Sequence, residues 1–152
     1  MSASSKVSFY LFFIILYIYQ LVSSVFYIFP PLLGFFFIYL LINYRKNGFD
    51  KTSLFIVLYL CFIEITHGIF LFTTCFTFLF FYYYIFEKLI YKLLNREFLI
   101  FVFTTFAYCF VIIVNVFFAY IFEINSVELN YYMLYYILIE SLLSIVVFRG
   151  LL

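Results

Sequence analysis

A long stretch without charge near the start of the chain most constrains its fold. Residues 7–44, between Lys6 and Arg45, contain no Asp, Glu, Lys or Arg. One bilayer crossing needs about 20 apolar residues, so this stretch is long enough for more than one. The whole chain of 152 residues is 70% hydrophobic and 10% charged, which leaves too few polar groups to cover a soluble domain. The sequence therefore predicts an integral membrane protein.

The apolar runs indicate helices rather than strands. Strands of a membrane barrel alternate apolar and polar residues over about 10 positions, whereas these runs are apolar on every face. The first run also exceeds the roughly 7–15 apolar residues of a cleavable signal, so we expect it to be retained as a span. The expected fold class is all-α integral membrane, with one transmembrane domain over residues 1–152.

Proline, glycine and charge divide the sequence into spans. Pro30 and Pro31 end the first run, because neither can donate a helix hydrogen bond and each disfavours helix in the residue before it. Asn47-Gly48 is a turn signal after the second run. The predicted spans are about 8–28, 32–44, 52–66, 69–86, 98–122 and 131–148. Several are short, so tilt or local thinning of the bilayer must make up the difference.

The basic residues predict the orientation of these spans. If the N-terminus lies inside, the inside segments hold all eight Lys and Arg of the chain: Lys6, Arg45, Lys46, Lys51, Lys88, Lys92, Arg96 and Arg149. The outside segments hold none, as the excess of positive charge in cytoplasmic loops requires. Merging 52–86 into one crossing would place the two basic clusters on opposite sides. We predict a six-transmembrane-helix bundle with both termini cytoplasmic.

The predicted cytoplasmic end of the fourth span has two further features. Tyr82-Tyr83-Tyr84 lies where tyrosine is favoured, at the boundary between membrane and water. Segment 87–97 follows, with Lys88 and Lys92 on one helical face and leucines on another. We expect it to extend the fourth helix along the membrane surface, either as a solvated helix end or as a partner-binding segment.

Ionisable residues inside a membrane are the candidates for function. A charge at the bilayer centre costs about 2.5–3.5 kcal/mol on the mildest scale, so such residues need a reason to be there. The stretch FIEITHG contains Glu64 and His67, which are three positions apart and share one side of a helix near its outer end. Glu140 falls in the middle of the last span, and Asn115 lies within the fifth.

Three roles are open for Glu64, besides simple exposure in a wet outer vestibule. It could be a neutral carboxyl that donates a hydrogen bond to a neighbouring helix. It could pair with His67 or with another helix as a structural contact. It could also form part of a proton or ion path with Glu140. We expect His67, next to Gly68, to be a helix-end residue, and Asn115 to be a polar contact between helices.

Signals for catalysis and cofactors are absent from the sequence. The chain lacks the HExxH and GxSxG motifs and any glycine-rich phosphate loop, and it has one His and four Gly. Its three cysteines follow no metal or redox spacing. A net charge of +1 gives no argument for a nucleic-acid partner. We expect a protein that is not an enzyme, with no cofactor and no metal site.

The order of features resembles the MreD family of rod-shape-determining membrane proteins. A proline opens the second span (FPPLLGFFFIYLLINYRKNGF), and a brief third span carries one acidic residue before a glycine turn (LYLCFIEITHG). The family pattern is roughly P-x-L…L-Y, then G-x-x-x-D-x-x-x-G. Pro31 and Tyr39 match its first part, Glu64 takes the place of the acidic residue, and Gly68 stands for the later glycine. The earlier glycine and a proline in the last span are missing.

The resemblance implies a fold and a role. It implies an architecture like the substrate-binding S-components of energy-coupling-factor transporters. It also implies a non-enzymatic scaffold in the bacterial inner membrane, which links cytoskeletal MreB to cell-wall synthesis together with a bitopic MreC-like protein. Glu64 would then determine the packing of the third span. The alternative is a substrate-binding subunit of a small-solute transporter, in which Glu64, Glu140 and His67 line an outward cavity.

Overall fold

The described part of the chain is entirely helical. The computed structural model describes residues 3–26, 28–92, 95–123, 132–148 and 150, without the side chains of 3–10 and 12. Its elements are α1 (Ala3–Val25), α2 (Leu33–Asn47), α3 (Lys51–Thr66), α4 (Thr73–Phe81), the π-helix η1 (Tyr82–Phe86), α5 (Glu87–Lys92), α6 (Arg96–Phe122) and α7 (Tyr132–Phe148). Because α4, η1 and α5 run on without a break, these elements form six helical rods, and the all-α prediction is confirmed.

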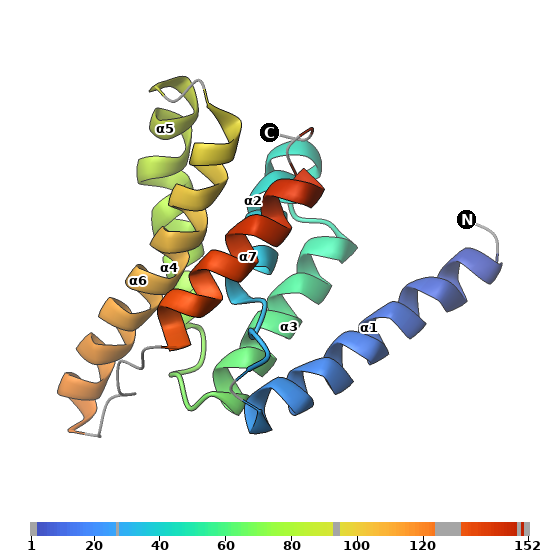
Figure 1. Ribbon diagram of the computed structural model, residues 1–152, viewed down its shortest axis with the longest axis horizontal. Helices are drawn as coiled ribbons and strands as arrows, with labels where there is room; N and C mark the ends of the chain where they lie inside the picture. Colours follow the sequence, from blue (N-terminus) through green and yellow to red (C-terminus); the bar gives the residue numbers. More distant parts are fainter. Residues whose placement is uncertain (1–2, 27, 93–94, 124–131, 149, 151–152) are drawn as a thin grey trace.

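Helix α2 lies at the centre of the fold. It packs against α3, α6 and α7, while α4 packs mainly on α6 (Figure 1). A helix that is apolar on all sides is normally buried, and α2 follows this rule, with Phe37, Ile38 and Leu41 fully enclosed. By contrast, α1 contacts α3 near its own C-terminal end and diverges from the other helices toward its N-terminus (Figure 1).

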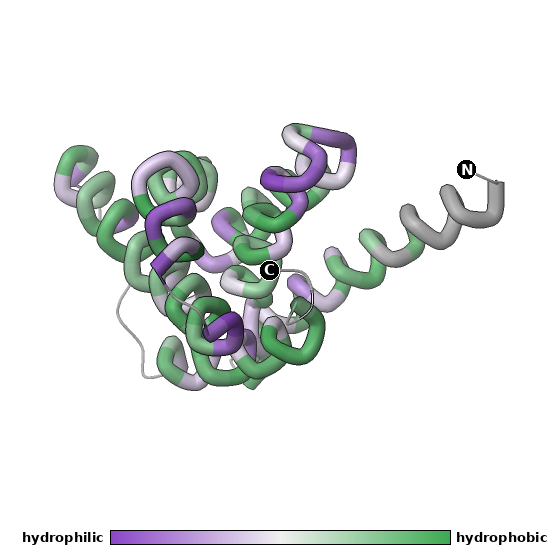
Figure 2. Tube along the Cα trace, turned by 90° about the horizontal axis from the view of Figure 1, so that it is seen from above, coloured by the Kyte–Doolittle hydropathy of each residue, from purple (hydrophilic) through white to green (hydrophobic). Residues whose placement is uncertain are grey.

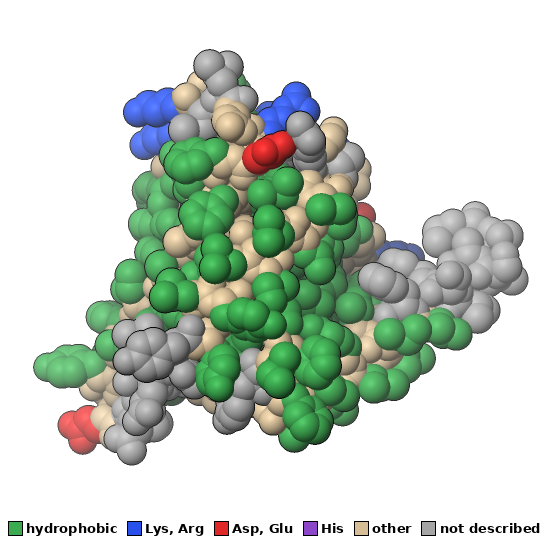
Figure 3. Space-filling model, in the orientation of Figure 1, with side chains coloured by type: hydrophobic (Ala, Val, Ile, Leu, Met, Phe, Trp, Pro, Cys, Tyr) green, Lys and Arg blue, Asp and Glu red, His purple; other side chains and the backbone are tan. Residues whose placement is uncertain are grey.

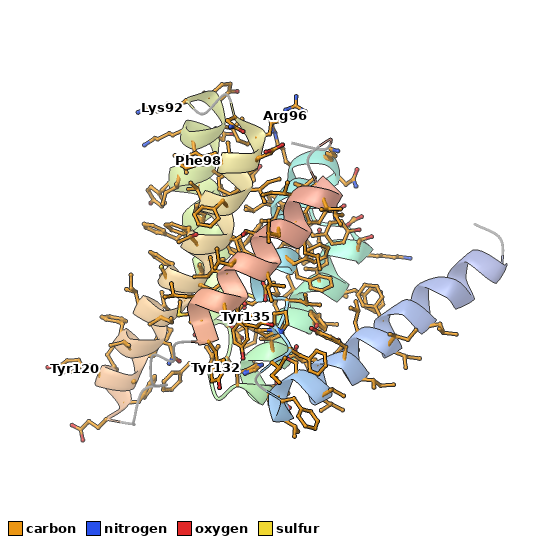
Figure 4. The ribbon with its side chains drawn as sticks, viewed as in Figure 1. Lys92, Arg96, Phe98, Tyr120, Tyr132 and Tyr135 are labelled. Carbon is orange, nitrogen blue, oxygen red and sulfur yellow. The ribbon has the colours of Figure 1, made fainter. Side chains whose placement is uncertain are left out.

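Charge and apolar surface are separated in space. Most of the Lys and Arg side chains visible in Figure 3 lie at the end of the molecule where α5 meets α6. Figure 4 places Lys92 and Arg96 at this end and Tyr120 and Tyr132 toward the other. Apolar residues dominate the helices between the ends (Figure 2), and many large apolar side chains face outward. The predicted positions of Arg149 and Tyr131, and of the Lys6 side chain, lie outside the described residues.

One described helix is long and apolar enough to cross a membrane. This is α6, with a mean hydropathy of 2.4 in its most apolar window. Phe13–Val25 and Tyr132–Phe148 are apolar but shorter. Length and composition are weak evidence by themselves, because a buried core helix of a soluble protein has the same properties.

Two predicted spans extend three or four residues beyond the observed helix. The first span was expected to reach residue 28, but α1 ends at Val25 and the chain folds back: Ser23 Oγ donates to the Phe29 carbonyl (2.8 Å) and Tyr19 OH donates to the Pro30 carbonyl (2.9 Å). The fourth was expected to begin at residue 69, but α4 begins at Thr73. At the other limits that the structure describes, the difference between prediction and observation ranges from none, at the ends of α3, α6 and α7, to six residues.

Two helices begin with ordinary N-caps. The carboxylate of Asp50 accepts the Ser53 N–H at the start of α3 (2.8 Å). The Asn95 side chain accepts the Glu97 N–H at the start of α6 (3.1 Å). Such side chains satisfy backbone N–H groups that have no partner within the first helical turn. Both starts lie at the ends of the segments 45–51 and 88–96, where the basic residues cluster.

The cap of α3 gives a pH-dependent prediction. The hydrogen bond from the Ser53 N–H lowers the pKa of Asp50 in the folded protein. The stabilisation by the ionised Asp50 is therefore present above the pKa of about 3.9 in the unfolded chain, and it is lost as the pH falls through the lower pKa of the folded protein. Asp50→Ala should cost about 0.5–2 kcal/mol at pH 7 and less at pH 3, measured by unfolding in detergent micelles. Asp50→Asn keeps the cap without titrating, and an Asp50→Ala effect that is equal at both pH values would contradict this role.

Candidate functional site

Helices α2 and α4 begin without caps of their own. Each starts after an apolar residue in the left-handed conformation, Leu32 with φ 61° and Phe72 with φ 68°, and neither side chain forms a capping hydrogen bond. The first N–H groups of a helix have no partner within the helix, and leaving them buried and unpaired is costly. Both buried glutamates of the described chain are found at these two places.

Glu64 caps α4 from the last turn of the preceding helix. Its side chain is fully buried. Its Oε2 atom accepts the Phe72 N–H at 2.7 Å, and its Oε1 atom accepts both the N–H (2.5 Å) and the hydroxyl (2.6 Å) of Thr74. A carboxylate is also favoured near a helix N-terminus by the helix dipole. Glu64 therefore fixes the point at which the chain re-enters helix.

The backbone of the same turn closes on Glu64 as well. His67 is the C-cap of α3, and Gly68 follows with φ 68°, a conformation that glycine adopts without strain. The Ile69 N–H donates to the Glu64 carbonyl (2.9 Å) and the Gly68 N–H to the Ile65 carbonyl (3.5 Å), which together form a Schellman motif. The stretch FIEITHG is thus the C-terminal end of α3, in which the Glu64 carbonyl accepts the Ile69 N–H and the Glu64 carboxylate caps α4.

A second helix holds this turn. The Oδ1 atom of Asn115, on α6, accepts the Phe70 N–H at 3.0 Å. Asn115 is 3% exposed, so this is a buried contact between α6 and the connection from α3 to α4. Such an amide contact is typical of polar residues that join membrane helices.

The Glu64–His67 pair allowed by their spacing is not formed. Both Glu64 oxygens instead accept N–H groups at the start of α4, those of Phe72 and Thr74. The Nε2 atom of His67 is buried and has no hydrogen-bond partner in the described part of the chain. Burial lowers the pKa of His67 below its ordinary value, so the imidazole is neutral at pH 7.

Glu140 caps α2 from the middle of α7. Its side chain is fully buried as well. Its Oε2 atom accepts the N–H groups of Gly34 (2.6 Å) and Phe35 (3.2 Å), and its Oε1 atom accepts the Tyr108 hydroxyl (2.5 Å). One carboxylate therefore joins α7, α6 and the first turn of α2. Pro30 and Pro31, just before α2, are buried too, and as prolines they have no N–H that would need a partner.

The close approach of α2 depends on Gly34. A Cβ atom at this position would lie 2.6 Å from Thr104 Cγ2, 3.1 Å from Glu140 Oε2 and 3.3 Å from Tyr108 Cε2. The first of these distances is far below van der Waals contact. A residue with a side chain would therefore push the start of α2 away from the carboxylate that caps it.

Gly34→Ala should destabilise the protein by about 1–3 kcal/mol, the usual cost of overpacking a core. Thr104→Ser removes the methyl group that the new Cβ meets, while its hydroxyl can keep the bond to the Ile100 carbonyl. The double variant should recover most of the lost stability in equilibrium unfolding. If Gly34→Ala unfolds like the wild type, or if Thr104→Ser gives no recovery, the close approach is not present.

The two carboxylates belong to separate sites. Glu64 and Glu140 share no hydrogen-bond partner, and each is enclosed by the groups it caps. A small pocket at the surface, with a volume of about 30 Å³, lies elsewhere, at the basic end of the molecule. Among the described residues, no group of three His, Cys, Asp or Glu side chains is placed to hold a metal ion.

Sequence reasoning missed the groups that the carboxylates bind. Gly34 had a usable signal, because it is the single glycine in the uncharged stretch 7–44. Thr74 follows Thr73 as a polar pair at the start of an apolar run, which is typical of a helix N-terminus. Tyr108 is one of 17 tyrosines, and nothing in its local sequence distinguishes it.

A comparison of the chain with models of protein families, with curated proteins and with solved structures gives no match.

Proposed function

We propose that the chain is a non-enzymatic scaffold of the bacterial inner membrane, with six spans and both termini cytoplasmic. Following the resemblance to the MreD family, it acts in the cell-elongation machinery together with a bitopic MreC-like protein. The six helical rods supply the spans, and the short ones tilt or thin the bilayer around them. The position of Lys92 and Arg96 at one end agrees with the orientation expected from the positive-inside rule.

One observation carries the proposal. The two glutamates that lie within the predicted spans direct their carboxylate oxygens to N–H and hydroxyl groups of the protein itself. A solute-binding subunit needs polar groups that converge on an open cavity, usually of about 300 Å³ or more. Here the buried acids join helices instead. The remaining feature is the large apolar surface, which suits lipid and the lateral faces of other membrane proteins.

Depletion of the protein in its own host tests the proposal. Rod-shaped cells should become round, and a wild-type copy should restore the rod. An affinity-tagged copy should co-purify with an MreC-like bitopic protein from solubilised membranes. Unchanged cell shape, or co-purification with an ATPase and a permease instead, would contradict the scaffold and indicate a transporter subunit.

The role of Glu64 is tested in the same cells. Glu64→Gln should fail to restore the rod, because a glutamine cannot satisfy both backbone N–H groups at the start of α4. Glu123→Gln is the matched control, since Glu123 is exposed at the end of α6. Membrane levels of each variant are measured by immunoblot, so that loss of the protein is distinguished from loss of its activity.

A further inference from the structure

A small pocket at the basic end of the molecule has a different character from the two capped sites. It lies between the last turn of α2 and the rod formed by η1 and α5. The residues that line it are Arg45, Tyr82, Phe86, Glu87, Ile90 and Tyr91. Its volume of about 30 Å³ admits a small polar group rather than a whole solute.

The π-helix η1 builds the aromatic wall of this pocket. Such segments contain one extra residue per turn and are frequent at functional sites. The Tyr82 and Phe86 rings stack with their centroids 5.5 Å apart, and Tyr82 packs edge-on against Tyr44 of α2 at 4.8 Å. The wall therefore holds its shape through packing between α2 and η1.

Two side chains of opposite charge line the pocket without pairing with each other. Arg45 and Glu87 both line it, and within the described residues neither forms an ion pair. Both are exposed, so water can reach them. Tyr91 adjoins Lys92, which Figure 4 places at the basic end of the molecule. In the proposed topology this end lies among the lipid headgroups of the cytoplasmic leaflet.

We propose that this pocket, together with the exposed surface beside it, binds the phosphoethanolamine headgroup of a membrane lipid. The Arg45 guanidinium donates to the phosphate, for which its planar fork of N–H groups is suited. The Glu87 carboxylate accepts from the ammonium group. A lipid with phosphate but no ammonium would bring a second negative charge beside Glu87, so the pocket selects phosphatidylethanolamine over phosphatidylglycerol. The inference rests on the proposed membrane placement and not on a role in cell shape.

Native mass spectrometry of the full chain in detergent tests the binding. The probes are phosphatidylethanolamine and phosphatidylglycerol with equal acyl chains, and inorganic phosphate. Wild-type protein should bind the ethanolamine lipid about tenfold more tightly than the glycerol lipid, and free phosphate should not displace it. Equal binding of the two lipids would overturn the proposal. Displacement by millimolar phosphate would also overturn it and indicate a site for free phosphate.

Three variants assign the binding to named side chains. Arg45→Ala should lower affinity for the ethanolamine lipid about tenfold, the usual effect of losing one charge-assisted contact. Glu87→Gln should remove the preference between the lipids. Lys46→Ala is the control, because Lys46 is exposed beside Arg45 but does not line the pocket. If Arg45→Ala binds as Lys46→Ala does, the pocket is not the site. Unfolding midpoints without lipid show that each variant is folded.

Discussion

Replacing Glu140 with alanine is expected to be among the most destabilising single substitutions in this protein. The substitution leaves the Gly34 and Phe35 N–H groups and the Tyr108 hydroxyl buried without their acceptor. Each buried group that loses its partner costs about 1–3 kcal/mol, and the missing side chain adds a cavity. We expect the free energy of unfolding to fall by at least about 3 kcal/mol, measured by equilibrium unfolding in mixed micelles.

Two further variants separate the contributions. Tyr108→Phe removes one hydroxyl and leaves both backbone bonds of Glu140, so it should cost about 1 kcal/mol. Glu123→Ala removes an exposed carboxylate and should change stability by less than about 0.5 kcal/mol. If Glu140→Ala were as mild as Glu123→Ala, the carboxylate would not be holding α2 in place.

Glutamine should be tolerated at position 140 but not at position 64. A glutamine side chain has one acceptor oxygen and one donor NH₂ group. At position 64, backbone N–H groups face both oxygens, so the NH₂ must oppose either the Phe72 or the Thr74 N–H. We expect Glu64→Gln to cost about 2–3 kcal/mol in the same unfolding assay.

At position 140 the same change can be accommodated. The backbone N–H groups of α2 both donate to Oε2, and the other oxygen faces the Tyr108 hydroxyl, which can rotate and accept from an NH₂ group. Glu140→Gln should therefore cost no more than about 1 kcal/mol. Equal costs at the two positions would show that the net charge of the carboxylates, rather than their pattern of acceptors, is what stabilises the fold.

Local signals allowed much of the fold to be predicted. The predicted third span, 52–66, coincides with α3 within one residue, because Asp50 at its start and Gly68 after its end act on the adjacent backbone. Gly48, with φ 69°, likewise ends α2 at the predicted Asn47-Gly48 turn. Such signals act on the backbone of residues next to them in the chain, so they can be recognised in a single sequence.

The partners of the buried acids could not be predicted in this way. Glu140 and Gly34 are 106 positions apart, and only the packing of α7 against α2 brings them together. A structural contact with another helix was among the roles considered for Glu64, but its form as a cap of the next helix was not, because capping depends on the path of the turn 67–72. The late start of α4 has the same cause, since the cap at Phe72 fixes where the helix begins.

Two buried carboxylates, those of Glu140 and Glu64, each hold the start of one helix. Hydrogen exchange of the full chain in nanodiscs, read by mass spectrometry on peptides covering 33–36 and 72–76, tests it most directly. Both segments should exchange slowly in the wild type. Glu140→Ala should accelerate exchange in 33–36 and leave 72–76 protected, and Glu64→Ala should do the reverse. Rapid exchange of both segments in the wild type, or protection unchanged by either substitution, would contradict the claim.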